Sequence, residues 1–206
     1  MTNGAVFPEA TPWPVRPGTV LAGPLATGHL AADLAVVRDG PVNLFLVQVP
    51  GGVVCIDAGW RRNRVRAGFR QLGLDPAGVL AVFLTHGHWD HAWGTGLFPG
   101  ARVHRGPGEG GLVSVNGVPV RAIPVPGHTA DSMAYLVAGR YLFTGDALRL
   151  KAGQVVPGHP WLSRDPKAML RSIARLAGEG QLSCVLTGHT GLSADPERAF
   201  GHWPVP

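Results

Sequence analysis

Short apolar runs, separated by turns rich in Gly and Pro, fill the first half of the chain. The runs are dominated by Val, Leu and Ile, which favours β-strands at such short lengths. Trp60–Leu72 is longer and is expected to form a helix, and a shorter helix is expected over His91–Phe98. We predict strands at Thr19–Ala22, Leu34–Val37, Val42–Val49, Val53–Ala58 and Val79–Thr85.

The second half repeats this plan of strands, helix, strand and helix. Asp165-Pro166 predicts a helix N-cap followed by proline at the first helical position, and Asp195-Pro196 predicts the start of a last short helix. The apolar face of the first of these helices is predicted to hold Met169, Leu170, Ile173 and Leu176. We predict strands at Val118–Val125, Ser132–Ala138, Arg140–Thr144 and Leu182–Thr187. Two such halves indicate an α/β protein, with two sheets packed together and helices outside them.

The composition is typical of a folded globular domain. Of the 206 residues, 45% are hydrophobic and 15% are charged, which is enough apolar material for a sizeable core. No low-complexity linker divides the chain, so we expect one domain over residues 1–206, with an irregular, proline-rich lead-in at residues 1–17. No secretory signal is visible, and no apolar run approaches the ~20 residues that a membrane span needs. We therefore expect a cytoplasmic protein that does not contact a membrane.

Charge and cysteine usage narrow the partners. The net charge is +5, and five arginines lie between Arg61 and Arg70. We interpret this cluster as a solvated helix face, because +5 is modest for a protein that binds nucleic acid. A basic surface nevertheless allows an anionic small-molecule substrate. Cys55 and Cys184 each lie within an apolar run and are expected in the core rather than in a disulfide.

The segment Thr85-His86-Gly87-His88-Trp89-Asp90-His91 is the strongest chemical signal in the sequence. It places three imidazoles and one carboxylate within six positions, directly after a predicted buried strand. Imidazole and carboxylate are the ligands that zinc and similar divalent metals prefer. A chance cluster on a surface loop would explain one histidine but not this combination. We therefore predict that His86, His88, Asp90 and His91 are metal ligands.

The arrangement His-x-His-x-Asp-His at the end of a strand resembles the hallmark of the metallo-β-lactamase superfamily. Further motifs of that family follow in order: Pro126-Gly127-His128-Thr129, Thr144-Gly145-Asp146 and Gly188-His189. An earlier segment, Cys55-Ile56-Asp57-Ala58-Gly59, resembles a family loop whose aspartate supports the site from outside the ligand set. The resemblance spans about residues 40 to 190. It implies a four-layer αβ/βα sandwich of the metallo-β-lactamase type.

The same resemblance implies a site for two divalent metal ions. His86, His88 and His128 would hold the first metal, and Asp90, His91 and His189 the second. Asp146 would bridge the two, and we expect Asp90 and Asp146 to act in catalysis. Asp57 would orient a ligand. Zinc is the expected metal, with iron and manganese as alternatives.

The resemblance further implies a hydrolase that uses a hydroxide bound between two metals to cleave a small ester-like bond, such as a thioester or lactone. Asp146 stands where one class of antibiotic-degrading lactamases has cysteine, which favours the glyoxalase II-like or lactonase-like branches. Only 17 residues follow His189, so we expect no helical domain of the kind with which glyoxalase II binds glutathione. Two alternatives stay open: a persulfide dioxygenase-like enzyme with one iron, and a nucleic-acid phosphodiesterase.

The substrate is not encoded in any motif. Segments 105–117 and 147–164 follow no pattern that predicts a ligand. His159, in Pro157-Gly158-His159-Pro160-Trp161, could line a substrate cleft, but we favour its interpretation as a loop histidine. Trp89 and Trp93 flank the predicted ligands and are expected to pack beside them, with Trp89 a candidate for the wall of the cleft. The oligomeric state is not predicted.

Overall fold

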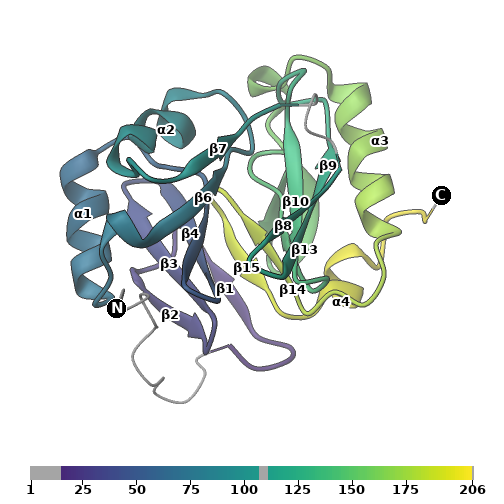
Figure 1. Ribbon diagram of the computed structural model, residues 1–206. Coiled ribbons are helices and arrows are strands. Elements are labelled where there is room, and N and C mark those ends of the chain that lie inside the picture. The colour runs from purple at the N-terminus through teal and green to yellow at the C-terminus, as the bar shows by residue number, and fades with distance from the viewer. Residues whose placement is uncertain (1–14, 107–110, 206) are drawn as a thin grey trace.

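The computed structural model describes residues 15–106 and 111–205, so residues 1–14 of the predicted lead-in lie outside the described range. Two β-sheets face each other, and helices cover their outer sides (Figure 1). The first sheet has six strands in the order β2-β3-β4-β5-β6-β7. Their bounds are Gly28–Ala31, Leu34–Asp39, Val42–Val49, Gly52–Ile56, Val79–Phe83 and Arg102–His104.

The second sheet has seven strands in the order β1-β15-β14-β11-β10-β9-β8. Their bounds, in the same order, are Val20–Ala22, Gly191–Ser193, Cys184–Thr187, Tyr141–Phe143, Met133–Val137, Val118–Pro124 and Leu112–Val115. A separate antiparallel hairpin is formed by β12 and β13, which span Leu148–Lys151 and Gln154–Pro157. The α-helices are α1 Arg62–Gln71, α2 Trp89–Ala92, α3 Pro166–Ala177 and α4 Pro196–Phe200, with short 3-10 helices at Pro76–Gly78, Trp93–Leu97 and Pro160–Leu162.

Three hydrophobic clusters separate these layers. The central cluster joins the inner faces of both sheets, where the rings of Phe45 on β4 and Phe143 on β11 lie 5.3 Å apart. A second cluster packs Val65 and Phe69 of α1 against the outer face of the six-stranded sheet. A third packs α3 against the outer face of the seven-stranded sheet, with Ile173 fully buried. Three apolar interfaces make four layers, so the predicted α/β sandwich is confirmed.

Most of the strands and helices predicted from the sequence are present, with small shifts at their ends. The strand Val42–Val49 has the predicted bounds, and both cysteines are buried. The arginines from Arg62 to Arg70 lie on the exposed side of α1, as expected for a solvated face. One prediction was wrong: Leu170 is 45% exposed, because the buried side of α3 is formed by Ala168, Met169, Ser172, Ile173 and Leu176.

The short helix near the histidine motif also differs from its prediction. It begins at Trp89 rather than His91, because the backbone of His88 is extended and its carbonyl accepts hydrogen bonds from the amides of His91 and Ala92. It ends at Ala92 and continues as a 3-10 helix that contains Gly94 and Gly96. Asp90 and His91 therefore lie within the first helical turn.

The short strands β2, β7, β8, β12, β13 and β15 were not predicted. Each has only three or four residues, and β8, β12 and β13 lie in segments 105–117 and 147–164, which follow no pattern that predicts a strand. Among the described residues, no helix is long and apolar enough to cross a membrane.

Strand direction explains why the chemical motifs meet. Strands β5 and β6 pair in parallel, so their carboxyl ends lie at the same edge of the first sheet. In the second sheet β11 and β14 are parallel, and β9 runs in the same direction because it and β11 are both antiparallel to β10. The loops that follow these strands carry Asp57, His86, His128, Asp146 and His189, so all five residues lie at one edge of the sandwich.

Candidate metal centre

The first sheet supplies the histidine motif. His86 is buried directly after β6, whereas His88 is exposed at the amino end of α2. His91 is completely buried, because the loop after β5 packs on α2 and on the 3-10 helix that follows it. Ala58 N donates to the His91 carbonyl over 2.7 Å, and Gly94 N donates to the Gly59 carbonyl over 2.7 Å. Strand β6 and helix α2 thus hold three imidazoles at fixed positions.

The second sheet contributes His128, Asp146 and His189 from the loops after β9, β11 and β14. Glycine precedes each of the three, and the space around Gly145 and Gly188 leaves no room for a side chain. A Cβ on Gly145, whose φ is +52°, would lie 2.4 Å from Thr85 Oγ1, and one on Gly188 would lie 2.6 Å from Asp146 Oδ1 and 2.8 Å from His91 Cε1. Glycine at these two positions lets the two sheets approach each other at the site.

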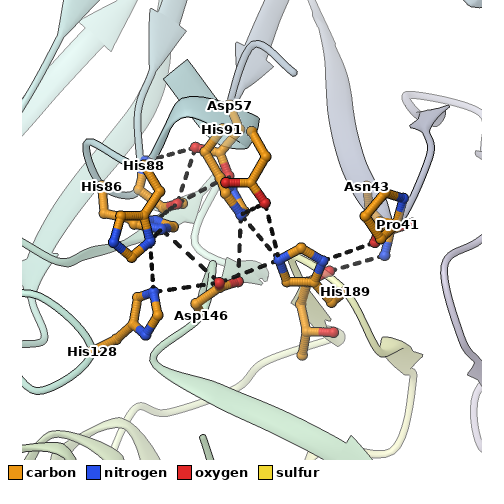
Figure 2. Close-up of polar contacts among 12 residues, drawn as sticks. Pro41, Asn43, Asp57, His86, His88, His91, His128, Asp146 and His189 are labelled. Carbon is orange, nitrogen blue, oxygen red and sulfur yellow. Dashed lines mark hydrogen bonds and ion pairs between the residues drawn. The ribbon is translucent and has the colours of Figure 1, made fainter. Parts of the chain in front are cut away.

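Nitrogen and oxygen atoms of seven side chains converge there (Figure 2). In one group, His88 Nδ1 lies 2.9 Å from His86 Nε2 and 3.0 Å from His128 Nε2. In the other, His91 Nε2 lies 3.2 Å from His189 Nε2, and Asp90 Oδ2 lies 3.9 and 3.8 Å from these two nitrogens. We refer to His86, His88 and His128 as the first group and to Asp90, His91 and His189 as the second group.

Asp146 lies between the two groups. Its Oδ2 is 3.5 Å from His128 Nε2 and 4.0 Å from His86 Nε2 in the first group, and 3.2 Å from His189 Nε2 in the second. Its Oδ1 is 3.6 Å from His91 Nε2 and is a buried oxygen without a hydrogen-bond partner among the described residues. The carboxylate of Asp146 therefore faces both groups at once.

Residues outside the cluster fix which nitrogen of each ring faces inward. His91 Nδ1 donates to Asp57 Oδ2 over 2.7 Å, and His189 Nδ1 donates to the Pro41 carbonyl over 2.8 Å. Thr85 Oγ1 lies 3.0 Å from both Asp57 oxygens and 3.1 Å from His86 Nδ1. The hydroxyl can donate to Asp57 and accept from His86, which leaves Nε2 of all three rings directed at the centre.

The charges in the cluster are strongly coupled. Burial, followed by the nearby His91, lowers the pKa of His86 to about 2, and burial also lowers the pKa of His128. Burial opposes protonation of His91 as well, but Asp57 and Asp146 raise its pKa to about 9. Although burial opposes ionisation of Asp146, the adjacent His91 and His189 hold its pKa well below the usual range. An ionised carboxylate thus lies among imidazoles at the centre.

This donor set fits divalent cations. The Nε2 atoms of His91 and His189 face each other at 3.2 Å, while both Nδ1 atoms donate to acceptors outside the cluster. Two neutral rings placed in this way would direct lone pairs at each other, so the contact requires a positive charge, supplied either by a proton on one Nε2, in line with the raised pKa of His91, or by a cation between the nitrogens. Asp146 Oδ1, buried without a partner, needs the same compensation. Neutral imidazoles with a few carboxylates are typical of zinc and related transition metals.

A pocket of about 450 Å³ opens beside the cluster. The side chains that line it come from both groups and from the β12–β13 region, and they include Leu148, Arg149, His159 and Leu162. His159 lies in a loop, as favoured from the sequence, and it also lines this pocket. Trp89 is not among the lining residues; it is 52% exposed, and its ring lies 4.5 Å from that of Trp60.

The structure brings together all seven residues that the sequence singled out as ligands, together with Asp57. Sequence reasoning did not anticipate Thr85, the Pro41 carbonyl or Arg149. Thr85 stands directly before the histidine motif, so its position was a usable signal. Pro41 acts through its backbone and Arg149 through a hairpin that was not predicted, and neither has a sequence signature.

Comparisons with known proteins agree with this picture. The profile of the Metallo-beta-lactamase superfamily matches residues 37–106. A hydroxyacylglutathione hydrolase of Ruegeria pomeroyi is 32% identical over 144 residues, which cover 57% of this chain and 54% of the relative. Metallo-beta-lactamase domain-containing protein 1 of Homo sapiens is 31% identical over 160 residues, which cover 66% of this chain and 58% of the relative. The chain therefore spans little more than half the length of these relatives.

Solved structures extend the similarity beyond the matched profile. A metallo-beta-lactamase family protein from Thermus thermophilus has a TM-score of 0.65 and 27% sequence identity, and the match covers 84% of this chain and 78% of that one. The similarity thus includes the second sheet, which carries His128, Asp146 and His189. The ordered motifs, the two-sheet sandwich and these similarities show that the chain belongs to the metallo-beta-lactamase superfamily.

Proposed function

We propose that this protein is a metal-dependent hydrolase that cleaves a small ester-like bond, such as that of a thioester or a lactone. The observation that carries the proposal is the position of Asp146, whose ionised carboxylate faces both groups of ligand atoms and has one buried oxygen without a partner among the described residues. Six side chains arranged around such a carboxylate support two cations that share it, with zinc as the expected metal.

Two divalent cations at such a centre would supply a hydroxide nucleophile at neutral pH and polarise the carbonyl oxygen of the substrate. Hydrolysis adds water across the scissile bond: the water oxygen bonds to the acyl carbon, and the leaving oxygen or sulfur takes up a proton. We assign the transfer of this proton to Asp90, whose carboxylate lies at the edge of the second group and lines the pocket. Asp146, whose carboxylate faces both groups, would be shared by the two cations.

The chain's other residues position these groups. Asp57 fixes His91 directly and His86 through the Thr85 hydroxyl, and the Pro41 carbonyl fixes His189. The pocket beside the centre has room for a small molecule. The hydroxyacylglutathione hydrolases among the relatives are named for an ester-like substrate, which supports this bond class over a phosphodiester.

Metal analysis combined with an activity screen tests the proposal. Purified protein should contain close to two equivalents of divalent metal. It should hydrolyse members of a panel of esters, thioesters and lactones, lose this activity on chelation and regain it with zinc. A phosphodiester substrate and a persulfide, the latter with oxygen uptake as the signal, complete the panel. One tightly bound iron with oxygen consumption, or turnover of the phosphodiester alone, would contradict the proposal.

A further inference from the structure

The pocket beside the metal centre contains one cationic side chain that the proposed chemistry does not use. Arg149 lies on β12, three residues after Asp146, and is the single Arg or Lys among the described residues that line the pocket. The described part of the chain places no Asp or Glu within ion-pair distance of it. Arg149 therefore brings an uncompensated positive charge to the wall of the pocket.

The guanidinium is held in place without being neutralised. Its Nε donates to the Pro157 carbonyl over 3.2 Å, and its Nη1 donates to His159 Nε2 over 3.1 Å. A guanidinium carries five N–H donors and has no acceptor, so three donors are left for a ligand. Because the carbonyl and the imidazole nitrogen are both neutral acceptors, they fix the orientation of the side chain and leave its charge available.

His159 acts as a positioning residue for Arg149. Its Nε2 accepts the arginine proton, while its own backbone carbonyl accepts from Ser163 Oγ over 2.9 Å. His159 also stands at the amino end of the 3-10 helix Pro160–Leu162, and Leu162 lines the same pocket. The hairpin and this short helix thus form one wall, where a fixed cation lies among the apolar side chains of Leu148 and Leu162.

We propose that Arg149 binds a carboxylate of the substrate, so that the enzyme acts on ester-like compounds carrying one carboxylate separated from the scissile bond by a short hydrocarbon chain. A planar guanidinium with free donors matches the two oxygens of a carboxylate. One positive charge balances one negative charge, which favours a carboxylate over a doubly charged phosphate monoester. The apolar side chains of the wall suit the hydrocarbon part. This inference rests on the proposed function for the bond that is cleaved.

A matched pair of substrates tests the inference. One is the 4-nitrophenyl monoester of adipic acid, with a free carboxylate, and the other is the same ester of adipamic acid, in which a neutral carboxamide of similar size replaces the carboxylate. In the zinc-loaded enzyme, Arg149→Gln should lower kcat/KM for the carboxylate substrate by about 10- to 100-fold, as for loss of a hydrogen-bonded charge pair. For the carboxamide the change should stay below about threefold.

Lys151→Gln is the control. Lys151 is an exposed cation on the same strand, outside the pocket, so this variant changes the net charge equally and should leave both substrates unaffected. Arg149→Lys keeps the charge without the planar donors and should fall between wild type and Arg149→Gln. Equal losses for both substrates in Arg149→Gln would overturn the inference, and so would a selectivity for the carboxylate that survives the substitution.

The role of His159 is tested through the same selectivity ratio. His159→Leu removes the acceptor that holds Arg149 and should reduce the preference for the carboxylate substrate, whereas His159→Gln keeps an acceptor oxygen and should restore most of it. A merely structural role would lower turnover of both substrates without changing their ratio. An unchanged ratio in His159→Leu would show that His159 does not position Arg149.

A binding measurement separates this inference from the proposed function. The monoanilide of adipic acid keeps the carboxylate but carries an amide in place of the reactive ester. Titrated into zinc-loaded, ¹⁵N-labelled protein, it should shift the Arg149 Nε–H resonance, and its Kd should weaken by at least about tenfold in Arg149→Gln. Such binding without hydrolysis of any ester would uphold the carboxylate site and contradict the proposed function. Hydrolysis of an ester, together with equal binding of this anilide and of the matching anilide of adipamic acid, would uphold the proposed function and contradict the carboxylate site.

Discussion

The two groups of candidate ligand atoms differ in how the fold supports them. The second group contains a carboxylate, and both of its imidazoles are anchored from outside, one by buried Asp57 and one by the Pro41 carbonyl. The first group has three imidazoles and no carboxylate of its own. His86 reaches Asp57 only through the Thr85 hydroxyl, and His88 is exposed.

This difference shows how support outside the ligand set is distributed. Asp57 serves both groups, directly at His91 and through a hydroxyl at His86. Direct contact with a charged oxygen fixes the ring orientation more strongly than a relay through a neutral hydroxyl. We therefore expect the second group to depend on Asp57 more than the first group depends on Thr85.

Removing the metal should have the largest effect, because it affects both groups. Chelation should abolish hydrolysis and lower the Tm by about 5–10 °C, since a ligand at 100 times its Kd contributes about 2.7 kcal/mol and each kcal/mol shifts the Tm of a chain of this size by about 2–4 °C. Calorimetry before and after chelation, with elemental analysis of both samples, measures this. An unchanged melting curve after verified removal would show that the removed metal was not held by this cluster.

Asp146→Ala should come next, because Asp146 faces both groups. Loss of the shared carboxylate increases repulsion between the two cations and removes the defined position of the nucleophile. We expect kcat to fall by at least about a hundredfold. The fold should persist, since Asp146 follows a strand and is not part of a hydrophobic cluster.

Asp195→Ala is a suitable control for Asp146→Ala. Asp195 caps α4 by accepting from Arg198 N, so its loss should cost about 1 kcal/mol of stability without changing metal content. Circular dichroism and metal analysis of both variants distinguish loss of a ligand from loss of stability. Full metal content and near-normal turnover in Asp146→Ala would mean that this residue is only a turn aspartate.

Asp57→Asn tests the stronger of the two supports. The amide is similar in shape but uncharged, so the hydrogen bond to His91 weakens and the negative charge near the centre is lost. Metal affinity or activity should fall by about 10- to 100-fold, as is typical for residues that orient ligands. Competition with a chromogenic chelator measures the affinities of both metals, and the weaker binding should be most pronounced for the second group.

Thr85→Val tests the weaker support and should have the smallest effect. Valine keeps the shape of threonine but breaks the relay to His86 and removes one donor from Asp57, while the backbone amide of Thr85 still donates to Asp57 over 2.8 Å. We expect metal affinity to fall by less than about tenfold. A larger loss than in Asp57→Asn would reverse the ranking of the two supports.

Local signals in the sequence were sufficient for the α/β class and for most strands and helices. Alternating or continuous apolar runs predicted the longer strands, and Asp-Pro pairs predicted the starts of α3 and α4. Six of the nine described strands with three or four residues were missed, because at that length pairing with neighbours rather than local preference decides the conformation, whereas β1, β11 and β14 were predicted from their apolar runs. Leu170 was misplaced for a related reason: spacing fixes a helix face only to within one residue.

What the sequence by itself determined is the chemistry of the centre: His86, His88, Asp90 and His91 stand within six positions, and His128, Asp146 and His189 belong to ordered motifs. What only the tertiary structure decided is the environment of these residues. The Pro41 carbonyl meets His189 from 148 positions away, and β12 places Arg149 in the pocket. Such contacts depend on strand direction and sheet packing, which join segments far apart in the chain. No local pattern encodes them. Every residue type has a backbone carbonyl, and a single arginine forms no motif with a recognisable spacing.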